Sequence, residues 1–309
     1  MKKIFAIILV LLMVASTLSA CATKDNSPSD AAKEQPVTES KEADKPGDAA
    51  DDKKDDVDEN PTRLDNILKA NKIIVGTSPD FAPMEFIDIN KTGMDQYVGV
   101  DMEFARFIAA ELGVELEIKT MDFGALITAV NAGTVDLVLS GFAWREERAE
   151  AMELTDFYNI QDAPNGQGIL ILKADADKYK TAEDFSGKTI AVQEISLQYA
   201  LLEEQLPDAI PKPITNINDG VLMLLSNKVD AVGVSSDNGM TIIANYPDLQ
   251  LSEFFYEYSS EGNVGGIMKG EVELLAKINE IVKKANEAGM FPIWENEAND
   301  LAGSIGWQN

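Results

Sequence analysis

The stretch Asn131-Ala132-Gly133-Thr134-Val135-Asp136 decides the fold. A helix-forming segment ends at a glycine, and a Val-Asp pair then opens an apolar run that is typical of a buried strand. Ser226-Asn227-Lys228-Val229-Asp230 repeats this arrangement in the second half of the chain. An earlier strand also recurs, first as Lys72-Ile73-Ile74-Val75 and then as Lys188-Thr189-Ile190-Ala191-Val192. Two such units predict an α/β protein of two lobes, with parallel strands joined by right-handed helical crossovers.

Strands and helices alternate outward from these stretches. The predicted strands are short apolar runs at 72–75, 114–118, 135–139, 169–172, 189–192 and 229–234. Helices are predicted where a side chain can cap a first turn, at Asp101, Asp122, Ser196 and Asp219. The alternation is the observation that favours two α/β units over a helical array.

A last amphipathic helix is predicted at 272–288, and we expect it to pack back on the first unit. The chain would then cross between the lobes twice, near 162–168 and near 259–265. Both crossings are rich in Gly, Asn and Ser, which absorb changes in φ and ψ at low cost, as a hinge requires. The predicted lobes are 61–162 together with 264–309, and 168–259.

The first twenty residues have the layout of a secretory signal peptide. Lys2 and Lys3 give a positive start, the run from Ile4 to Val14 is apolar, and small residues follow. The alternative is a transmembrane helix, but a bilayer core needs about 20 apolar residues and this run is too short. We therefore expect residues 1–20 to be removed on export.

The residues around the only cysteine, Leu18-Ser19-Ala20-Cys21, resemble the lipobox of bacterial lipoproteins. The resemblance implies cleavage before Cys21 and diacylglycerol on its thiol, and two acyl chains are enough for stable anchoring. Residues 22–60 carry six lysines, thirteen acidic residues and no aromatic ring. Such a composition cannot bury enough apolar surface to fold. We expect 21–60 to be a lipidated, disordered acidic tether on the extracellular side of the cell membrane.

Composition excludes several classes of function. The net charge is −27, and the 309 residues include no histidine. An acidic surface repels phosphate backbones, so no nucleic-acid partner is expected. Histidine is the commonest metal ligand and general base. With the single cysteine lipidated, a zinc site or a cysteine nucleophile is also excluded. We expect no metal, no cofactor and no catalytic residue.

Five segments, in the same order, resemble family 3 of the bacterial solute-binding proteins, which serve ATP-driven importers of polar amino acids. The matching segments are Gly76-Thr77-Ser78-Pro79-Asp80-Phe81-Ala82-Pro83-Met84-Glu85-Phe86, Gly99-Val100-Asp101-Met102-Glu103-Phe104-Ala105, Val135-Asp136-Leu137-Val138-Leu139-Ser140-Gly141 with Glu147-Arg148, Leu154-Thr155-Asp156-Phe157-Tyr158, and Asp184-Phe185-Ser186-Gly187-Lys188-Thr189-Ile190-Ala191-Val192. The likeness runs from Arg63 to the end of the chain. It implies a two-lobed periplasmic-binding-protein-like fold of type II, with a two-segment hinge and the ligand held between the lobes.

The resemblance assigns Arg148 to the carboxylate of the ligand. A guanidinium fork holds a carboxylate by two parallel charge-assisted hydrogen bonds. From spacing alone, Arg148 would be a surface arginine paired with Glu147 or Glu153. Ser196 matches a position at a helix start, where its hydroxyl and the free N–H groups can receive the same carboxylate. A plain N-cap role for Ser196 is compatible with this.

The loop after the third strand is implied to meet the ligand at Ser140, Gly141 and Ala143. Small side chains there let the backbone approach closely. Two neighbouring aromatic residues, Phe142 and Trp144, either line the pocket or pack against the first lobe.

Two further aromatic residues, Phe81 and Phe123, match the apolar walls that sandwich the side chain of the ligand. The alternative for both is a place in the core. Gln193 matches a position that contacts the ligand side chain.

The ammonium group of the ligand lacks its usual partner in this sequence. Ser235 stands where the family carries an aspartate, with Asp237 two residues later, and Ser78 stands where many members have an acid. Asp237 or Glu194 could supply the missing charge. Arg145 replaces the usual threonine, which removes one hydroxyl contact.

The implied function is capture of a polar amino acid outside the cell and its delivery to the permease and ATPase subunits of an ABC importer. The protein would act as a monomer held at the membrane through Cys21. A ligand sensor and a dehydratase-type enzyme on the same scaffold are the alternatives. The enzyme would need an acid or base in the cleft, and Glu85 and Glu194 are the plausible acids. Importer genes beside its own would separate importer from sensor.

Overall fold

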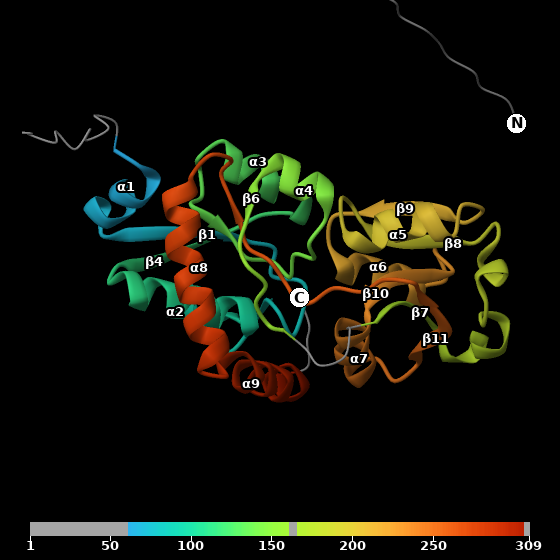
Figure 1. Ribbon diagram of the computed structural model, residues 1–309. Coiled ribbons are helices and arrows are strands. Elements are labelled where there is room, and N and C mark those ends of the chain that lie inside the picture. Colours follow the sequence, from blue (N-terminus) through green and yellow to red (C-terminus); the bar gives the residue numbers. More distant parts are fainter. Residues whose placement is uncertain (1–60, 161–165, 306–309) are drawn as a thin grey trace, which may run out of the picture. The chain divides into compact units, whose positions relative to one another are not determined.

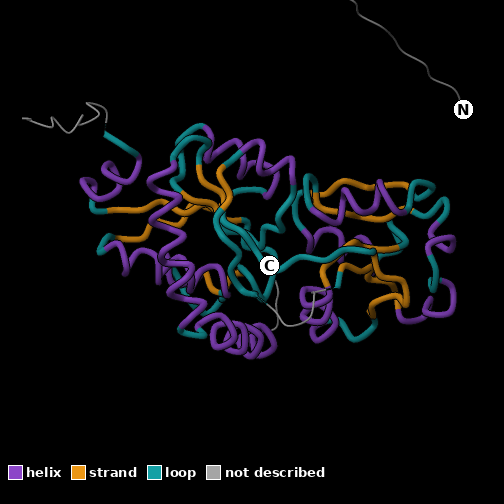
Figure 2. The backbone as a smooth tube through the Cα atoms, viewed as in Figure 1, coloured by secondary structure: helices purple, strands orange, loops and turns teal. Residues whose placement is uncertain are grey.

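The computed structural model describes residues 61–160 and 166–305. Within these residues the backbone forms two five-stranded sheets and a two-stranded ribbon, β2 (Phe86–Ile87) with β3 (Tyr97–Val98). Helices pack against both sheets (Figures 1 and 2). The expectations for residues 1–60, for part of the first crossing at 161–165 and for 306–309 lie outside the described residues.

The first sheet combines parallel strands with one antiparallel strand. In spatial order its strands are β4 (Glu115–Thr120), β1 (Lys72–Thr77), β5 (Leu137–Val138), β12 (Gly266–Ile267) and β6 (Glu153–Leu154). Strand β1 runs parallel to β4 and β5, whereas β12 is antiparallel to β5 and β6. The strand predicted at 135–139 is present but shorter, as β5.

The second sheet repeats this mixture. In spatial order its strands are β11 (Leu249–Tyr256), β7 (Gln167–Leu172), β10 (Ala231–Ser235), β8 (Thr189–Gln193) and β9 (Ile210–Ile214). Strand β8 is parallel to β9 and β10, and β7 is antiparallel to β10 and β11. The prediction of parallel strands is therefore wrong for β7, and β12, which was not predicted as a strand, is antiparallel as well. Both strands enter their sheet from a crossing segment and not from a helical crossover.

Two segments join the sheets, one from β6 to β7 and one from β11 to β12. Their backbones are hydrogen-bonded to each other. The N–H of Tyr158 donates to the carbonyl of Asn263 at 2.9 Å, and the N–H of Asn263 donates to the carbonyl of Tyr158 at 2.9 Å. The described structure is thus two-lobed, with two antiparallel connections lying side by side.

The helices divide between the two sheets. Those that accompany the first sheet are α1 (Arg63–Ala70), α2 (Val100–Leu112), α3 (Leu126–Asn131), α4 (Glu146–Ala151), α8 (Val272–Glu287) and α9 (Met290–Ile305). Those of the second sheet are α5 (Leu197–Gln205), α6 (Ile217–Leu225) and α7 (Ser236–Asn245). In no helix of the described residues did we find the length and apolar character needed to span a membrane.

The predicted cap at Asp101 is wrong. Helix α2 begins one residue earlier, with Gly99 as its N-cap. Gly99 has a φ of 115°, and a Cβ there would lie 2.4 Å from the carbonyl oxygen of Met84, so only glycine fits. Asp101 is consequently inside the helix, and its fully buried carboxylate is available for other contacts.

The other predicted caps have mixed outcomes. Ser196 is confirmed as a cap, because its hydroxyl accepts a 3.0 Å hydrogen bond from the first turn of α5. Asp122 precedes only a short 3-10 turn and makes no side-chain cap bond. Helix α6 starts before Asp219, because Asn216 caps it through the N–H of Asn218.

The C-terminal helices return to the first sheet, as predicted. Helix α8 ends at Glu287, close to the predicted end, and contacts α1 and α2. Helix α9 packs on α2, where the rings of Phe291 and Trp294 lie 5.1 and 6.4 Å from the ring of Phe104. These rings help bury the face of α2 that looks away from solvent.

The Val-Asp pair has the same structural role in both lobes. In the first sheet the carboxylate of Asp136 accepts the N–H of Ile74 at 2.7 Å, and in the second the carboxylate of Asp230 accepts the N–H of Thr189 at 2.8 Å. A backbone hydrogen bond of 2.8 Å between the same two residues accompanies each contact. The repeated aspartate therefore ties the start of one parallel strand to its neighbour.

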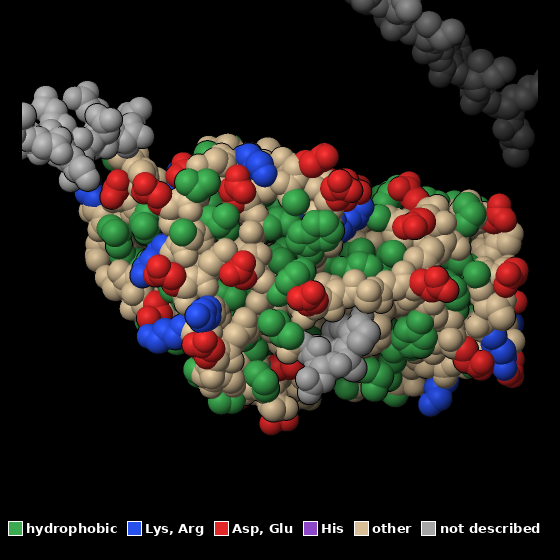
Figure 3. Space-filling view, viewed as in Figure 1, with side chains coloured by type: hydrophobic (Ala, Val, Ile, Leu, Met, Phe, Trp, Pro, Cys, Tyr) green, Lys and Arg blue, Asp and Glu red, His purple; other side chains and the backbone are tan. Residues whose placement is uncertain are grey.

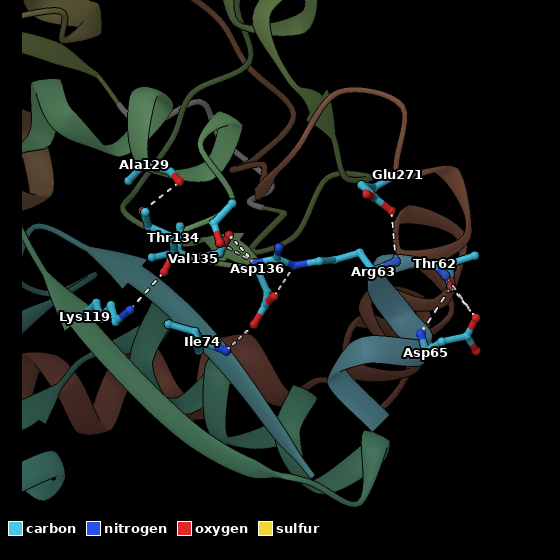
Figure 4. Close-up of polar contacts among 11 residues, drawn as sticks. Thr62, Arg63, Asp65, Ile74, Lys119, Ala129, Thr134, Val135, Asp136 and Glu271 are labelled. Carbon is cyan, nitrogen blue, oxygen red and sulfur yellow. Dashed lines mark hydrogen bonds and ion pairs between the residues drawn. The ribbon is translucent and has the colours of Figure 1, made fainter. Parts of the chain in front are cut away.

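In the first lobe, Asp136 also anchors helix α1 (Figure 4). The Arg63 guanidinium forms an ion pair with Asp136, and its Nη2 donates to the carbonyls of Gly133 at 2.8 Å and Val135 at 3.2 Å. The backbone N–H of Arg63 donates to Glu271 at 3.2 Å. The first described helix is thus fastened to the amino ends of the strands.

We expect Arg63→Met to lower the free energy of unfolding by about 2–4 kcal/mol, because it leaves the nearly buried Asp136 without its cation. Methionine keeps most of the aliphatic stem, so the loss reports on the guanidinium. Urea unfolding followed by circular dichroism measures it. Lys283→Met is the control, since Lys283 and Glu287 form an exposed pair whose loss should change stability by less than about 1 kcal/mol. Equal losses in the two variants would contradict the anchor.

Candidate functional site

A cavity lies among the loops at the carboxyl ends of parallel strands from both sheets. This edge of an α/β sheet is where ligands usually bind. Ten of the eleven predicted site residues line the cavity, namely Phe81, Phe123, Ser140, Gly141, Ala143, Arg148, Gln193, Ser196, Ser235 and Asp237. The structure does not bring the remaining residue, Ser78, to this cavity.

Arg148 is a buried cation on the cavity wall, with 3% of its surface exposed. Its Nη1 donates to the carbonyl of Ala143 at 2.8 Å, and its Nη2 donates to the carbonyl of Ile195 at 3.2 Å. The guanidinium carbon lies 4.5 Å from the ring centre of Phe142 and 5.5 Å from that of Phe123. Helix α4 and residues just before α5 thus hold the fork in place from both lobes.

No carboxylate of the described residues lies within ion-pair distance of Arg148. The sequence alternatives fail, because Glu147 pairs with Arg145 and Glu153 pairs with Lys269. Burial, and then the charge of Arg145, lower the pKa of Arg148 to about 10, so the group stays charged at neutral pH. A buried charge is costly unless something compensates it, and an anion in the cavity would do so.

Elsewhere the protein is strongly acidic. Asp and Glu side chains are distributed over the face seen in Figure 3 and are not gathered in one patch. The net charge of −27 gives most of the surface a potential that disfavours anions. The buried guanidinium is therefore a local positive site in an acidic protein, and the cavity carries charges of both signs, because Asp237 and Glu261 also line it.

The turn that carries Ser140 and Gly141 is closely packed against Phe81. Gly141 has a φ of +55°, and a Cβ at this position would lie 2.8 Å from the Phe81 ring. The ring therefore occupies the space that a side chain would need. Phe81 and Phe123 both line the cavity, so their apolar faces are available to a ligand as well as to the core.

The two open questions about neighbouring aromatic residues have different answers. Phe142 is fully buried and packs under the guanidinium of Arg148. Trp144 is 47% exposed and lines a separate surface groove.

The serines of the second lobe cap helices at the cavity. Ser196 caps α5, and the next two residues, Leu197 and Gln198, also line the cavity. Ser235 caps α7, and its hydroxyl accepts the N–H of Asn238 at 3.3 Å. Asp237, in the first turn of α7, lines the cavity as well. Two helix starts therefore converge on one space, and the positive ends of their dipoles favour negative charge there.

The side chain of Ser78 binds the neighbouring Asp80 and not the cavity. Its hydroxyl donates to the Asp80 carboxylate at 3.0 Å. Asp80 also accepts the side-chain amide of Gln193, at the end of β8, at 3.0 Å and the N–H of Ile217, at the start of α6, at 2.9 Å. The Gln193 amide nitrogen is thus engaged by the protein, while Gln193 still lines the cavity. Glu194 lies apart from the cavity, in another surface depression.

Three carboxyl groups are buried together behind the cavity wall. Asp80, Glu85 and Asp101 have at most 2% of their surface exposed, and no Lys or Arg of the described residues pairs with them. Burial raises the pKa of Asp80 and of Asp101 to about 6. Burial, and then repulsion from Asp101, raise the pKa of Glu85 well above its ordinary value. These three carboxyl groups therefore bind protons more readily than exposed carboxyls do. A positive charge placed near them would favour their ionised form.

Sequence reasoning missed part of the cavity. Its additional lining residues include Met84, Asn159, Gln167, Gln198, Tyr258, Ser260, Glu261 and Asn263. Several of these belong to the crossing segments, whose Gly, Asn and Ser content we interpreted as a hinge signal only. Groups of three or more side chains suited to a metal ion were not found among the described residues.

Known proteins with the same features were found by sequence. The model of the bacterial extracellular solute-binding proteins, family 3, matches residues 73–292, which include strands of both sheets. The chain is 30% identical over 220 residues to the "Arginine-binding extracellular protein ArtP" of Bacillus subtilis (strain 168). That match covers 71% of this chain and 82% of the relative.

Solved structures show the same two-lobed fold. An amino acid ABC transporter substrate-binding protein from Streptococcus pneumoniae Canada MDR_19A, bound to L-arginine, matches with a TM-score of 0.70 and 29% identity. The match covers 77% of this chain and 97% of the Streptococcus pneumoniae chain. The ancestral amino acid-binding protein AncCDT-1, a precursor of cyclohexadienyl dehydratase, matches with a TM-score of 0.66 and 28% identity, over 76% and 98% of the chains. The chain therefore belongs to family 3 of the bacterial extracellular solute-binding proteins.

Proposed function

We propose that the protein captures a free polar amino acid outside the cell and delivers it to the permease and ATPase subunits of an ABC importer. The observation that carries the proposal is Arg148, a buried charged fork on the cavity wall with no carboxylate partner among the described residues. An α-carboxylate is the anion that a free amino acid offers, and it fits a guanidinium fork. The arginine-binding relatives support this choice of ligand class.

In the proposed complex the α-carboxylate contacts Arg148 and the first turn of α5 at Ser196. The ammonium group points toward the acidic part of the wall, where Asp237 lines the cavity. Phe81 and Phe123 cover the side chain of the ligand. The remaining predicted residues, Ser140, Gly141, Ala143, Gln193 and Ser235, complete the contact surface, and Ser78 acts indirectly through Asp80. The proposed lobes are 61–162 with 264–309, and 168–259.

We propose a non-enzymatic role, although AncCDT-1 is named as the precursor of a dehydratase. Glu85 is fully buried behind Ser140, and Glu194 lines a different depression, so neither candidate acid lines the cavity. A general acid or base must come within hydrogen-bond reach of its substrate. Mass spectrometry of amino acids recovered after incubation tests this, and any net conversion would contradict a pure binding role.

Calorimetric titration of the full chain, purified in detergent, with each of the twenty common amino acids tests the proposed function. We expect at least one polar amino acid to bind with a dissociation constant in the micromolar range or below. D-enantiomers of the amino acids that bind serve as the control, because they cannot place carboxylate, ammonium and side chain in the same three places. No heat from any of the twenty would overturn the proposal.

We further propose that residues 1–20 are a signal peptide and that lipid on Cys21 holds a monomer on the outer face of the cell membrane. Cys21→Ala should move the protein from the membrane pellet to the soluble fraction, because both acyl chains are lost together. Cell fractionation with immunoblotting measures the distribution. Ser19→Thr, two residues away, is the control and should leave the protein in the pellet. Membrane retention of Cys21→Ala would contradict the lipid anchor.

A further inference from the structure

Asp101 reaches the cavity wall from behind. Its Oδ2 accepts the N–H of Gly141 at 2.7 Å, and its Oδ1 accepts the hydroxyl of Tyr158 at 2.9 Å. Asp101 is fully buried and does not line the cavity, whereas Ser140 and Gly141 do. The carboxylate therefore holds the Ser140–Gly141 peptide from a position that is not part of the cavity lining.

The contact with Asp101 also determines how the Ser140–Gly141 peptide unit is oriented. The peptide bond between Ser140 and Gly141 is trans, so its N–H and its C=O point in opposite directions. With the N–H of Gly141 directed at Asp101, the carbonyl of Ser140 is directed away from Asp101. That carbonyl accepts no hydrogen bond from any described residue, and neither does the carbonyl of Gly141. Among residues 61–160 and 166–305, two acceptors in the wall are thus left without a partner.

The hydroxyl of Ser140 cannot replace its carbonyl in this role. Its oxygen accepts the N–H of Ser78 at 3.1 Å, and its proton is donated to Glu85 at 2.8 Å. Both contacts are buried and face the carboxyl cluster. The side chain of Ser140 therefore fixes the turn from the inside, and its backbone oxygen is the acceptor of this residue that stays unused among the described residues.

We propose that Asp101 is a positioning residue that holds the Ser140 carbonyl toward the cavity as an acceptor for the ammonium group of the bound amino acid. This inference rests on the proposed function. It supplies a partner for the ammonium group in a sequence that has serine at 78 and at 235. The negative charge of Asp101 lies directly behind the same peptide and has no cation partner among the described residues, so the incoming ammonium group also compensates it.

The first test needs no ligand. In the full chain labelled with ¹⁵N, the amide proton of Gly141 should resonate unusually far downfield, because it makes a short hydrogen bond to a charged carboxylate. Asp101→Leu should shift it upfield by about 1 ppm or more. Asp101→Asn, whose amide oxygen can still accept, should shift it much less. An unchanged Gly141 resonance in Asp101→Leu would overturn the inference.

The second test compares two probes by calorimetry, L-arginine and its des-amino analogue 5-guanidinopentanoate. In the wild-type chain the ammonium group should improve affinity roughly 10- to 100-fold, as a hydrogen-bonded charge does. In Asp101→Leu this ratio should fall to about threefold or less, mainly through weaker binding of L-arginine. Tyr158→Phe is the matched control, because it removes the other donor to Asp101 but leaves the Gly141 contact, and the ratio should persist.

The outcomes separate the inference from the proposed function. Equal weakening of both probes in Asp101→Leu would show a merely structural role and overturn the inference. If Asp101→Leu does not fold, Asp101→Asn decides, because it should keep part of the ratio through its remaining acceptor. If L-arginine gives no heat with the wild-type chain, L-glutamine and glutaramate are used as the second pair. If neither pair gives a heat of binding, the result counts against the proposed function. The Gly141 resonance then tests the inference about Asp101 without a ligand.

Discussion

Replacing Arg148 by alanine should reduce amino-acid affinity roughly 100- to 1,000-fold, which corresponds to about 3–4 kcal/mol. The guanidinium is buried, charged and free of carboxylate partners among the described residues, so a ligand carboxylate gains most of its binding energy there. Without it, a carboxylate would enter a cavity surrounded by acidic protein with nothing to compensate its charge. Calorimetric titration with the amino acid that binds the wild-type chain most tightly measures the loss.

Two further variants make this result specific. Arg148→Lys keeps the charge but lacks the planar fork, and we expect it to recover only part of the affinity. Arg106→Ala removes a half-buried arginine that pairs with Glu103 on α2 outside the cavity, and it should bind as the wild type does. Full affinity in Arg148→Ala would mean that the carboxylate is held elsewhere, and the proposed orientation of the ligand would be wrong.

The ligand-free protein should lose stability as the pH rises from 5 to 7.5, by about 3 kcal/mol or more. Burial raises the pKa of Asp80 and of Asp101 from 3.8 to about 6. A carboxyl with a raised pKa in the folded state contributes stability that is complete below its unfolded pKa and is lost as the pH rises through about 6. A shift of two units corresponds to about 3 kcal/mol for one group over the whole interval between the two pKa values, and roughly half of this is lost above pH 5, so the two groups together account for about 3 kcal/mol. Urea unfolding across this pH range measures the trend.

Matched variants identify the carboxyls responsible for this pH dependence. Asp101→Asn removes one of the two titrations near pH 6 and should flatten the dependence by about half. Asp184→Asn is the control, because backbone hydrogen bonds from Lys180 and Thr181 lower the pKa of Asp184, so its titration is over below pH 5. Stability that increases between pH 5 and 7.5 would show that the buried carboxyls do not control it.

Much of the fold could be predicted because its signals are local. Buried strands such as β1 and β8 are apolar runs, and the Val-Asp pairs mark the start of a strand in both halves. What could not be predicted depends on contacts between distant residues. Asp101 has the same local pattern as a helix cap, but Gly99 caps the helix and the carboxylate instead holds Gly141, forty residues away in sequence.

A site residue could be predicted from the sequence where its side chain suits one kind of ligand group, as arginine suits a carboxylate. Arg148 could be placed at the cavity from its motif, although its burial and its contact with Ile195 of the other lobe have no signature in the sequence. Ser78 shows the opposite case. A serine in a ligand loop reads as a ligand contact, but the hydroxyl of Ser78 is used by Asp80, which joins the two sheets through Gln193. Only the assembled lobes reveal that use.

The Arg63 anchor also determines where this protein can be attached to a surface or fused to a reporter. Helix α1 is fastened at Asp136, where β5 is about to begin, whereas Ser140 and the cavity follow its other end. A fluorescent protein or a sensor chip joined before Pro61 would therefore be attached at the amino ends of the strands, away from the binding loops at their carboxyl ends. The described domain contains no cysteine of its own, so a single cysteine introduced at exposed Ile195 could carry an environment-sensitive dye beside Arg148.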